Sequence, residues 1–158
     1  MLSLLHIENI AVIESADISF DRGFNVLTGE TGAGKSIVID AISAILGQRA
    51  YRDMIRTGTS KASVRAVFTD VPELSWFEDN GVAYDPETVI QREVYLDGKN
   101  VCRVNGSLVS VSILHKLGIQ LINIHGQHDS AALFDEVNHL SFLDAFGDNE
   151  GLRQDYLQ

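Results

Sequence analysis

The chain has 158 residues, of which 45% are hydrophobic and 22% charged, the composition of an ordinary globular protein with room for one domain. No apolar stretch is long enough to cross a membrane, and the single cysteine, Cys102, excludes an internal disulfide. We therefore expect a cytoplasmic protein with no membrane partner, in which Cys102 is a small buried residue.

The net charge of −10 is distributed unevenly along the sequence. Residues 129–158 contain seven acidic residues and one basic residue, so this tail contributes −6 and the first 128 residues contribute −4. An acidic tail of this kind is most simply a solvated surface. The charge balance therefore neither supports nor excludes nucleic acid as a partner.

The N-terminal part is expected to begin with β-structure. Apolar and polar residues alternate over residues 2–20, which predicts two strands around Asn9, and a turn follows at residues 21–23. Residues 24–27 are a short apolar run, predicted to be a strand that leads into a glycine-rich loop.

A helix is predicted to follow this loop, from Gly34 to about Leu46. It is apolar nearly all round, which predicts a buried helix, and Gly47 is suited to end it. Three arginines come next, spaced so that a single helical turn would place them on one face: Arg49, Arg52 and Arg56.

The middle of the sequence predicts further strands. Alternation over residues 64–68 predicts a strand, and residues 71–86 are expected to be irregular. Two runs at residues 89–96 and 101–105, separated by a turn at Asp97-Gly98, predict a β-hairpin.

The C-terminal part predicts helices on either side of one strand. Ser107 is a candidate cap for a helix that runs to about Lys116. Residues 121–124 are expected to form a strand that delivers the polar cluster at 125–129. Further helices are expected at about 136–146 and from about 149 onward.

The loop matches the phosphate-binding motif G-x-x-x-x-G-K-[ST] with residues Gly29, Glu30, Thr31, Gly32, Ala33, Gly34, Lys35 and Ser36. Glycines allow backbone N–H groups to point at phosphate oxygens, and the helix N-terminus adds a positive partial charge. Lys35 would lie near the β- and γ-phosphates, and the Ser36 hydroxyl can ligate Mg²⁺. The motif therefore predicts a site for ATP with Mg²⁺; the alternative is a glycine-rich turn with a surface lysine.

Four groups of segments together resemble the N-terminal half of an ABC-type ATPase head of the SMC-like group: residues 5–14; 29–36 with 39–42; 55–58 with 62–68, 91–94 and 103–106; and 121–129. The loop and the last segment are specifically similar to a bacterial family that repairs DNA double-strand breaks. The resemblance implies an α/β P-loop NTPase fold, with a mixed β-sheet around the phosphate-loop helix. It also implies a lobe over residues 1–146, with the start of a truncated coiled-coil helix over 147–158.

The resemblance further implies roles for single residues outside the loop. Gln127 resembles the glutamine that ligates Mg²⁺ together with Ser36 and senses the γ-phosphate, and a solvated loop residue is the alternative. Arg56 resembles an arginine that approaches nucleotide or DNA, and a solvated basic edge is the alternative. A metal site is another possibility, because three residues near Gln127 are of types that bind metals: His125, His128 and Asp129. A hydrogen-bonded loop explains these residues better.

Groups needed for hydrolysis are missing from the sequence. No apolar run ends in Asp-Glu, since Ser141 interrupts the nearest candidate at residues 140–144, and no Leu-Ser-Gly-Gly motif occurs. No complete catalytic set is therefore present, and we expect ATP binding with little or no turnover. The resemblance implies as partners the C-terminal half of the same head, a second head in an ATP-sandwiched dimer, and DNA through the parent protein at the bacterial nucleoid.

Three other functions are compatible with the phosphate loop. The chain could belong to another SMC-like or RecF-like head. It could be a small-molecule P-loop kinase in which the basic residues 49–56 act as a lid, or a docking module whose loop is vestigial.

Overall fold

The computed structural model of the chain describes residues 1–29, 34–122, 124 and 147. The chain divides into residues 1–123 and residues 124–158, and all elements described below lie in the first unit. The predicted helices beyond residue 135 and the predicted domain boundary at residue 146 lie outside the described residues. Among the helices that are described, none is long and apolar enough to cross a membrane.

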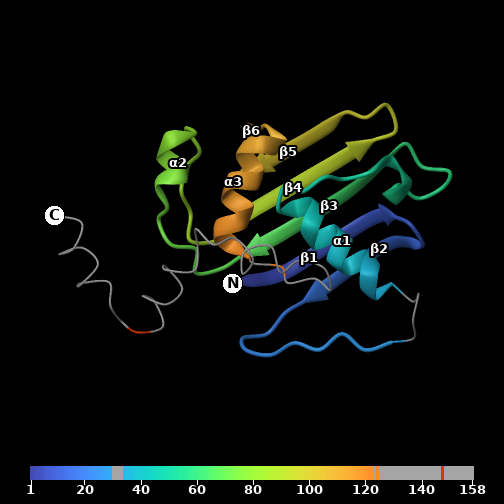
Figure 1. Cartoon of the computed structure of the whole chain (residues 1–158), viewed down its shortest axis with the longest axis horizontal. Helices are drawn as coiled ribbons and strands as arrows, with labels where there is room; N and C mark the ends of the chain where they lie inside the picture. The colour runs from blue at the N-terminus through green and yellow to red at the C-terminus, as the bar shows by residue number, and fades with distance from the viewer. Residues whose placement is uncertain (30–33, 123, 125–146, 148–158) are drawn as a thin grey trace. The chain divides into compact units, whose positions relative to one another are not determined.

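The first unit is built on a six-stranded sheet with the strand order β2-β1-β3-β4-β5-β6 (Figure 1). Every pairing between these strands is antiparallel. The α/β architecture is therefore as predicted, whereas the described sheet is antiparallel throughout and not mixed. The strands are β1 (Leu2–Ile10), β2 (Ile13–Ser19), β3 (Lys61–Phe68), β4 (Thr88–Tyr95), β5 (Asn100–Val104) and β6 (Ser107–Val109).

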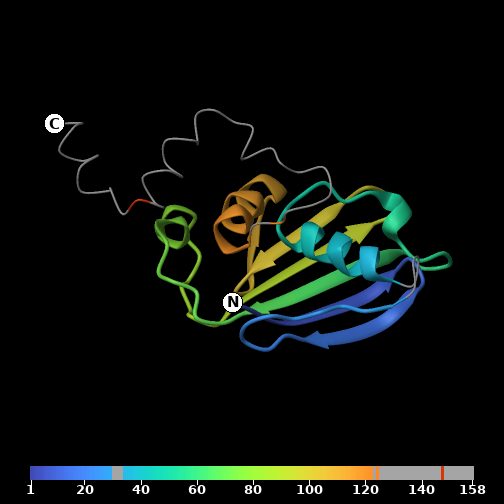
Figure 2. The same cartoon turned by 60° about the horizontal axis from the view of Figure 1, so that its bottom comes forward.

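Two helices, α1 (Lys35–Ile45) and α3 (Val111–Leu121), cover the same face of the sheet (Figure 2). Alternate residues of the strands point toward these helices, and the register aligns a fully buried apolar row beneath them: Leu5, Ala66, Ile90 and Val104. The opposite face carries polar side chains at the neighbouring positions, in the row His6, Arg65, Gln91 and Arg103. The core therefore lies between one face of the sheet and its two helices.

The helix predicted after the glycine loop is present, and Gly47 ends it. The Gly47 N–H donates to the Ala44 carbonyl and the Gln48 N–H to the Ser43 carbonyl, with Gly47 at a φ of 78°. Only the side of α1 toward the sheet is buried, and Ile39 on the other side is 45% exposed. The prediction of a helix buried all round is wrong because, within the described residues, no second layer covers α1.

Two predictions near the N-terminus are corrected. The turn between the first two strands falls at Ala11-Val12, and Asn9 stays inside β1 with a φ of 56°. The expected strand at residues 24–27 is not formed, and Phe24 is 94% exposed. An extended segment needs a neighbouring strand to satisfy its backbone, and the described sheet offers this segment none.

The cap predicted at Ser107 is also wrong. Ser107 belongs to β6 and pairs with Val104, and the N-cap of α3 is Ser110, whose Oγ accepts a hydrogen bond from the Ile113 N–H at 3.2 Å. The helix extends to Leu121, so the predicted strand at 121–124 is replaced by helix at its first residue.

The region predicted to be irregular contains a short helix, α2 (Ser75–Asp79). The Trp76 indole N–H donates to the Ile113 carbonyl at 3.0 Å, so α2 is attached to the start of α3. Buried aromatic packing, with the Trp76 and Phe77 rings 5.3 Å apart and edge to face, favours the helix although no side chain caps it.

Candidate phosphate-binding site

The start of α1 presents backbone donors that the helix itself does not use. The first α-helical hydrogen bond runs from the Val38 N–H to the Gly34 carbonyl at 3.1 Å, so the N–H groups of Ser36 and Ile37 have no partner within the helix. Gly34 has a φ of 101°, a conformation that favours glycine, and neither a side-chain cap nor an acidic first-turn residue is present. This N-terminus is therefore suited to an anion.

Lys35 connects the two described ends of the loop. Its ammonium group donates to the Gly29 carbonyl, and Ser36 beside it is exposed. Four of the eight predicted loop residues are thus brought together at the start of α1: Gly29, Gly34, Lys35 and Ser36. The other four lie outside the described residues: Glu30, Thr31, Gly32 and Ala33.

A hollow of about 210 Å³ adjoins Lys35. Its walls are mainly apolar, and it is lined by Val12, Ile13, Leu27, Thr28, Gly34, Lys35 and Val38. The sequence reasoning missed the contribution of the β1–β2 turn, because this turn joins the loop only through tertiary packing. The turn therefore offers an apolar contact next to the cation and the helix N-terminus.

Arg56 is bonded to a residue that lines this hollow, Val12. Its Nη1 donates to the Val12 carbonyl at 2.8 Å, and its backbone N–H donates to the Asn9 carbonyl at 2.9 Å. The nearby residue Met54 accepts from the Ala11 N–H at 2.8 Å. These bonds fasten the segment that carries Arg56 to the β1–β2 turn.

The other two arginines do not join Arg56. Only Arg52–Met54 is helical, as the 3-10 helix η1, so the single helical turn that would align the three is not formed. The Arg49 guanidinium lies 5.1 Å from the Tyr51 ring centroid, and Arg52 Nη2 donates to the Asp97 carbonyl at 3.4 Å. Of these three arginines, Arg56 is the one whose side chain bonds to a residue lining the hollow beside Lys35.

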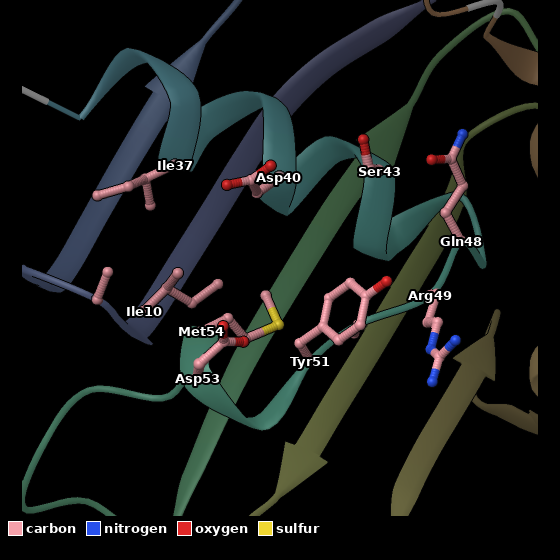
Figure 3. Close-up of a pocket in the computed structure, with 11 residues that line it drawn as sticks. Ile10, Ile37, Asp40, Ser43, Gln48, Arg49, Tyr51, Asp53 and Met54 are labelled. Atoms are coloured by element: carbon pink, nitrogen blue, oxygen red, sulfur yellow. The ribbon is translucent and has the colours of Figure 1, made fainter. Parts of the chain in front are cut away.

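A larger hollow of about 390 Å³ lies between α1 and residues 48–54 (Figure 3). Figure 3 shows Asp40 on α1 above Asp53 and Met54 on the facing segment. The hollow is lined by Ile10, Ala11, Ile37, Asp40, Ser43, Gln48, Arg49, Ala50, Tyr51, Asp53 and Met54. Its two carboxylates make it a poor site for phosphate, so the anion-binding end is the hollow beside Lys35.

A buried arginine holds the far end of α1. Arg92 is 3% exposed, and its Nη1 donates to the carbonyls of Ala44 at 2.7 Å and Gln48 at 2.6 Å, while its Nη2 donates to Asn100 Oδ1 at 2.9 Å. Burial lowers the pKa of Arg92. The sequence reasoning missed this residue, although an arginine at an inward position between Ile90 and Val94 was a visible signal.

The residues after α3 that were considered as ligands of nucleotide or metal lie outside the described residues: Gln127, His125, His128 and Asp129. Across the part of the chain that is described, no group of three or more His, Cys, Asp or Glu side chains could hold a metal ion. Cys102 is buried as predicted, and burial raises the pKa of its thiol.

A family model described as an AAA domain matches residues 4–139. The chain is 44% identical over 154 residues to the DNA repair protein RecN of Bacillus subtilis, covering 95% of this chain and 27% of that protein. It is 39% identical to the DNA repair protein RecN of Vibrio cholerae, covering 96% of this chain and 28% of that protein. The chain thus spans about a quarter of the length of the curated relatives it matches.

Solved structures of similar fold include SMC head domains. A structure from work on ATP-driven dimerization and DNA-stimulated activation of SMC ATPases has a TM-score of 0.67 at 23% identity, covering 90% of this chain and 97% of that one. The SMC head domain from Thermotoga maritima has a TM-score of 0.58 at 27% identity, covering 73% of this chain and 41% of that one. These likenesses agree with the P-loop NTPase lobe predicted from the sequence.

Proposed function

The chain belongs to the AAA domain family as a RecN-like member, and on this premise we propose that it is the ATP-binding N-terminal lobe of an SMC-like DNA repair ATPase. The observation that carries the proposal is the start of α1, where the N–H groups of Ser36 and Ile37, which the helix does not use, converge with the Lys35 ammonium and the exposed Ser36 hydroxyl. Such a combination of donors, cation and hydroxyl suits the phosphates of a nucleotide with its metal ion.

The residues present fit ATP with Mg²⁺. The N–H groups of Ser36 and Ile37 and the Lys35 ammonium would hold phosphate oxygens, and the Ser36 hydroxyl would ligate Mg²⁺ with Gln127 as a further ligand. Residues 30–33 would complete the loop around the phosphates. Arg56 would approach the nucleotide from beside the β1–β2 turn, a role supported by its bond to the Val12 carbonyl. Bound Mg²⁺ would supply charge neutralisation of the phosphates.

The lobe supplies one part of a composite site. The acidic residues and the signature motif that the sequence lacks come, in this proposal, from the C-terminal half of the head and from a second head. The likeness to SMC structures, among them one from work on ATP-driven dimerization, supports partners of this kind. The parent protein acts on DNA double-strand breaks by recombinational repair in the bacterial cytoplasm, an interpretation supported by the RecN relatives.

Calorimetric titration of the chain with ATP in the presence of Mg²⁺ tests the proposal. Lys35→Ala should weaken binding at least about tenfold, because a charge-assisted contact to phosphate contributes about 1.5–3 kcal/mol. Lys116→Ala is the matched control, since this lysine is exposed on α3, and it should bind as the wild type does.

Two results would contradict the proposal. Equal binding by Lys35→Ala and the wild type would show that the loop does not hold phosphate. Hydrolysis of ATP by the chain alone, abolished by Lys35→Ala, would show that the catalytic groups are already present and that the half-site interpretation is wrong.

A further inference from the structure

The connection between β3 and β4 is longer than an antiparallel strand pair needs, and its own hydrogen bonds hold it together. It runs over residues 69–87 and contains α2, whereas hairpin loops usually have about 2–5 residues. The Val71 N–H donates to the Pro86 carbonyl at 3.1 Å, and the Tyr84 hydroxyl donates to the Val71 carbonyl at 2.8 Å. Long connections with an ordered structure of their own commonly carry a function.

This connection is also fastened to the rest of the unit, far from the phosphate loop. The Trp76 indole N–H attaches α2 to α3, and Asn105 Nδ2 donates to the Ala83 carbonyl at 2.9 Å. It leaves β3 at Phe68, which is paired with Leu2 at the start of β1, whereas the hollow beside Lys35 adjoins the far end of β1. Figure 1 and Figure 2 accordingly show α2 at the opposite end of the sheet from the start of α1.

A hollow of about 550 Å³, which we call the α2 hollow, opens on this connection. Its wall combines apolar side chains with two carboxylates: Leu74, Phe77, Val82, Tyr84, Glu73 and Glu78. The Phe77 ring is buried and lies edge to face against the Tyr84 ring, with the centroids 5.3 Å apart. The apolar part of the wall therefore has a fixed shape, and it leaves room for side chains of another molecule.

The charge around the α2 hollow is of one sign. Residues 70–87 contain no lysine or arginine but six acids: Asp70, Glu73, Glu78, Asp79, Asp85 and Glu87. Among the described ion pairs, Asp70 is the only one of these acids that takes part, in a contact with Arg22 at 2.8 Å. The other five acids are exposed. Glu73 and Glu78 can therefore accept an external cation without breaking a described ion pair.

Apolar walls beside carboxylates suit the side chains of arginine and lysine. Both residues bury an apolar stem while the charged head stays near water or a counter-ion. Arginine suits the site better, because its planar guanidinium can form two parallel hydrogen bonds to a carboxylate. Nucleic acid would be repelled by the six acids, and a metal ion would make no use of the apolar wall. Charge complementarity therefore favours a basic protein segment.

We propose that the α2 hollow binds an arginine-rich segment of a partner protein that also carries apolar side chains. The guanidinium groups pair with Glu73 and Glu78, and the apolar side chains contact Leu74 and Tyr84. This contact joins the lobe to another protein without using α1 or its loop. The inference goes beyond the proposed function and does not depend on ATP binding.

Fluorescence anisotropy of the 158-residue chain with two labelled peptides tests the inference. One peptide alternates arginine with leucine, and the other alternates arginine with glycine at the same length and charge. The arginine–leucine peptide should bind at least about tenfold more tightly, because it alone can fill the apolar part of the hollow. Leu74→Ala should reduce this preference and leave the arginine–glycine peptide unaffected.

The two glutamates are tested together. Glu73→Gln/Glu78→Gln should weaken binding of the arginine–leucine peptide about tenfold, since each exposed ion pair contributes roughly threefold. The matched control Glu14→Gln/Asp53→Asn removes the same charge at exposed positions near the other end of β1 and should stay within about twofold. ATP binding by Glu73→Gln/Glu78→Gln should equal that of the wild type.

Three results would overturn the inference. Equal losses in the two double variants would mean that the acids form only a solvated surface, and equal affinity for the two peptides would mean that the hollow is not filled. Binding of spermine as tightly as the arginine–leucine peptide would assign the hollow to a small polyamine. ATP binding by the wild type without peptide binding would refute this inference and leave the proposed function standing.

Discussion

Arg92 fixes the phosphate-loop helix through a charge that has no carboxylate partner among the described ion pairs. Its counter-charge is the C-terminal end of α1, where the Ala44 carbonyl in the last turn carries negative partial charge of the helix, and the Gln48 carbonyl just beyond the helix is a second acceptor. Asn100 completes the set from β5. A single side chain thereby connects α1 to two strands of the sheet, at the end of the helix opposite the proposed phosphates.

Arg92→Met tests how strongly this arrangement stabilises the unit. Methionine keeps the apolar stem but removes the guanidinium donors from the carbonyls of Ala44 and Gln48 and from Asn100 Oδ1, so we expect a loss of about 2–4 kcal/mol in the free energy of unfolding. Urea denaturation at neutral pH measures it. Arg65→Met, on the exposed face of the neighbouring strand, should change stability by about 0.5 kcal/mol or less. Similar effects of the two substitutions would mean that the guanidinium contacts contribute little.

At the scale of the elements, α1 and α3 meet through their backbones. A Cβ at Gly118 would lie 2.3 Å from the Leu46 carbonyl oxygen, and a Cβ at Gly47 would lie 2.5 Å from the His115 nitrogen. Neither backbone can move away easily, because Arg92 holds one helix and the sheet supports both. The two glycines therefore set the spacing of the helix pair.

Gly118→Ala distinguishes packing from helix propensity. Alanine is favoured over glycine within a helix by about 1 kcal/mol, so propensity alone predicts stabilisation. The clash with Leu46 predicts instead a net loss of about 1–3 kcal/mol, measured as a lower urea midpoint. Gln120→Ala, on the exposed side of the same helix, serves as the control and should change stability little. An increase in stability for Gly118→Ala would show that the helices can move apart.

Elements fixed by local signals could be predicted from the sequence. The β4–β5 hairpin follows from alternation and Asp97-Gly98, and α1 follows from its position between the glycine loop and Gly47. The pair Asn105-Gly106, with φ values of 48° and 81°, forms the turn into β6 and was an available hairpin signal. Without this turn, the helix cap was predicted at Ser107, three residues before the cap that the structure shows.

Features that depend on distant contacts could not be predicted in the same way. The motif located Lys35 and Ser36, because their chemistry follows from spacing along the chain. The position of Arg56 beside the hollow depends on backbone bonds to the β1–β2 turn, and sequence spacing carries no information about such bonds. The exposure of residues 24–27 likewise depends on which strands are present to pair with them.

At the scale of the whole molecule, the unit leaves apolar side chains uncovered near the phosphate loop. Phe24 and Val26 are exposed on a segment outside the sheet, and Ile39 is exposed on α1. Exposed apolar surface of this kind commonly marks an interaction site. It supports the C-terminal half of the head as the partner that covers the segment, in agreement with the proposed function.

A pair of phenylalanines tests whether the segment contributes to the stability of the unit itself. Phe24→Ser should change the free energy of unfolding by about 0.5 kcal/mol or less, because its ring is almost fully exposed. Phe77→Ser, at a ring that is 2% exposed, should cost about 3–5 kcal/mol. Urea denaturation of the 158-residue chain gives both values. Comparable losses would show that residues 24–27 pack inside the unit and are not reserved for a partner.

The position of Arg92 also changes the electric field of the phosphate-loop helix. An isolated helix acts as a dipole, with about half a positive charge at its start and half a negative charge at its end. The guanidinium at the end of α1 offsets the negative pole, so the positive pole at the start of the helix is less opposed by its far end. Because salt screens charges beyond about 8 Å, this effect is confined to a triphosphate that has already reached the start of α1.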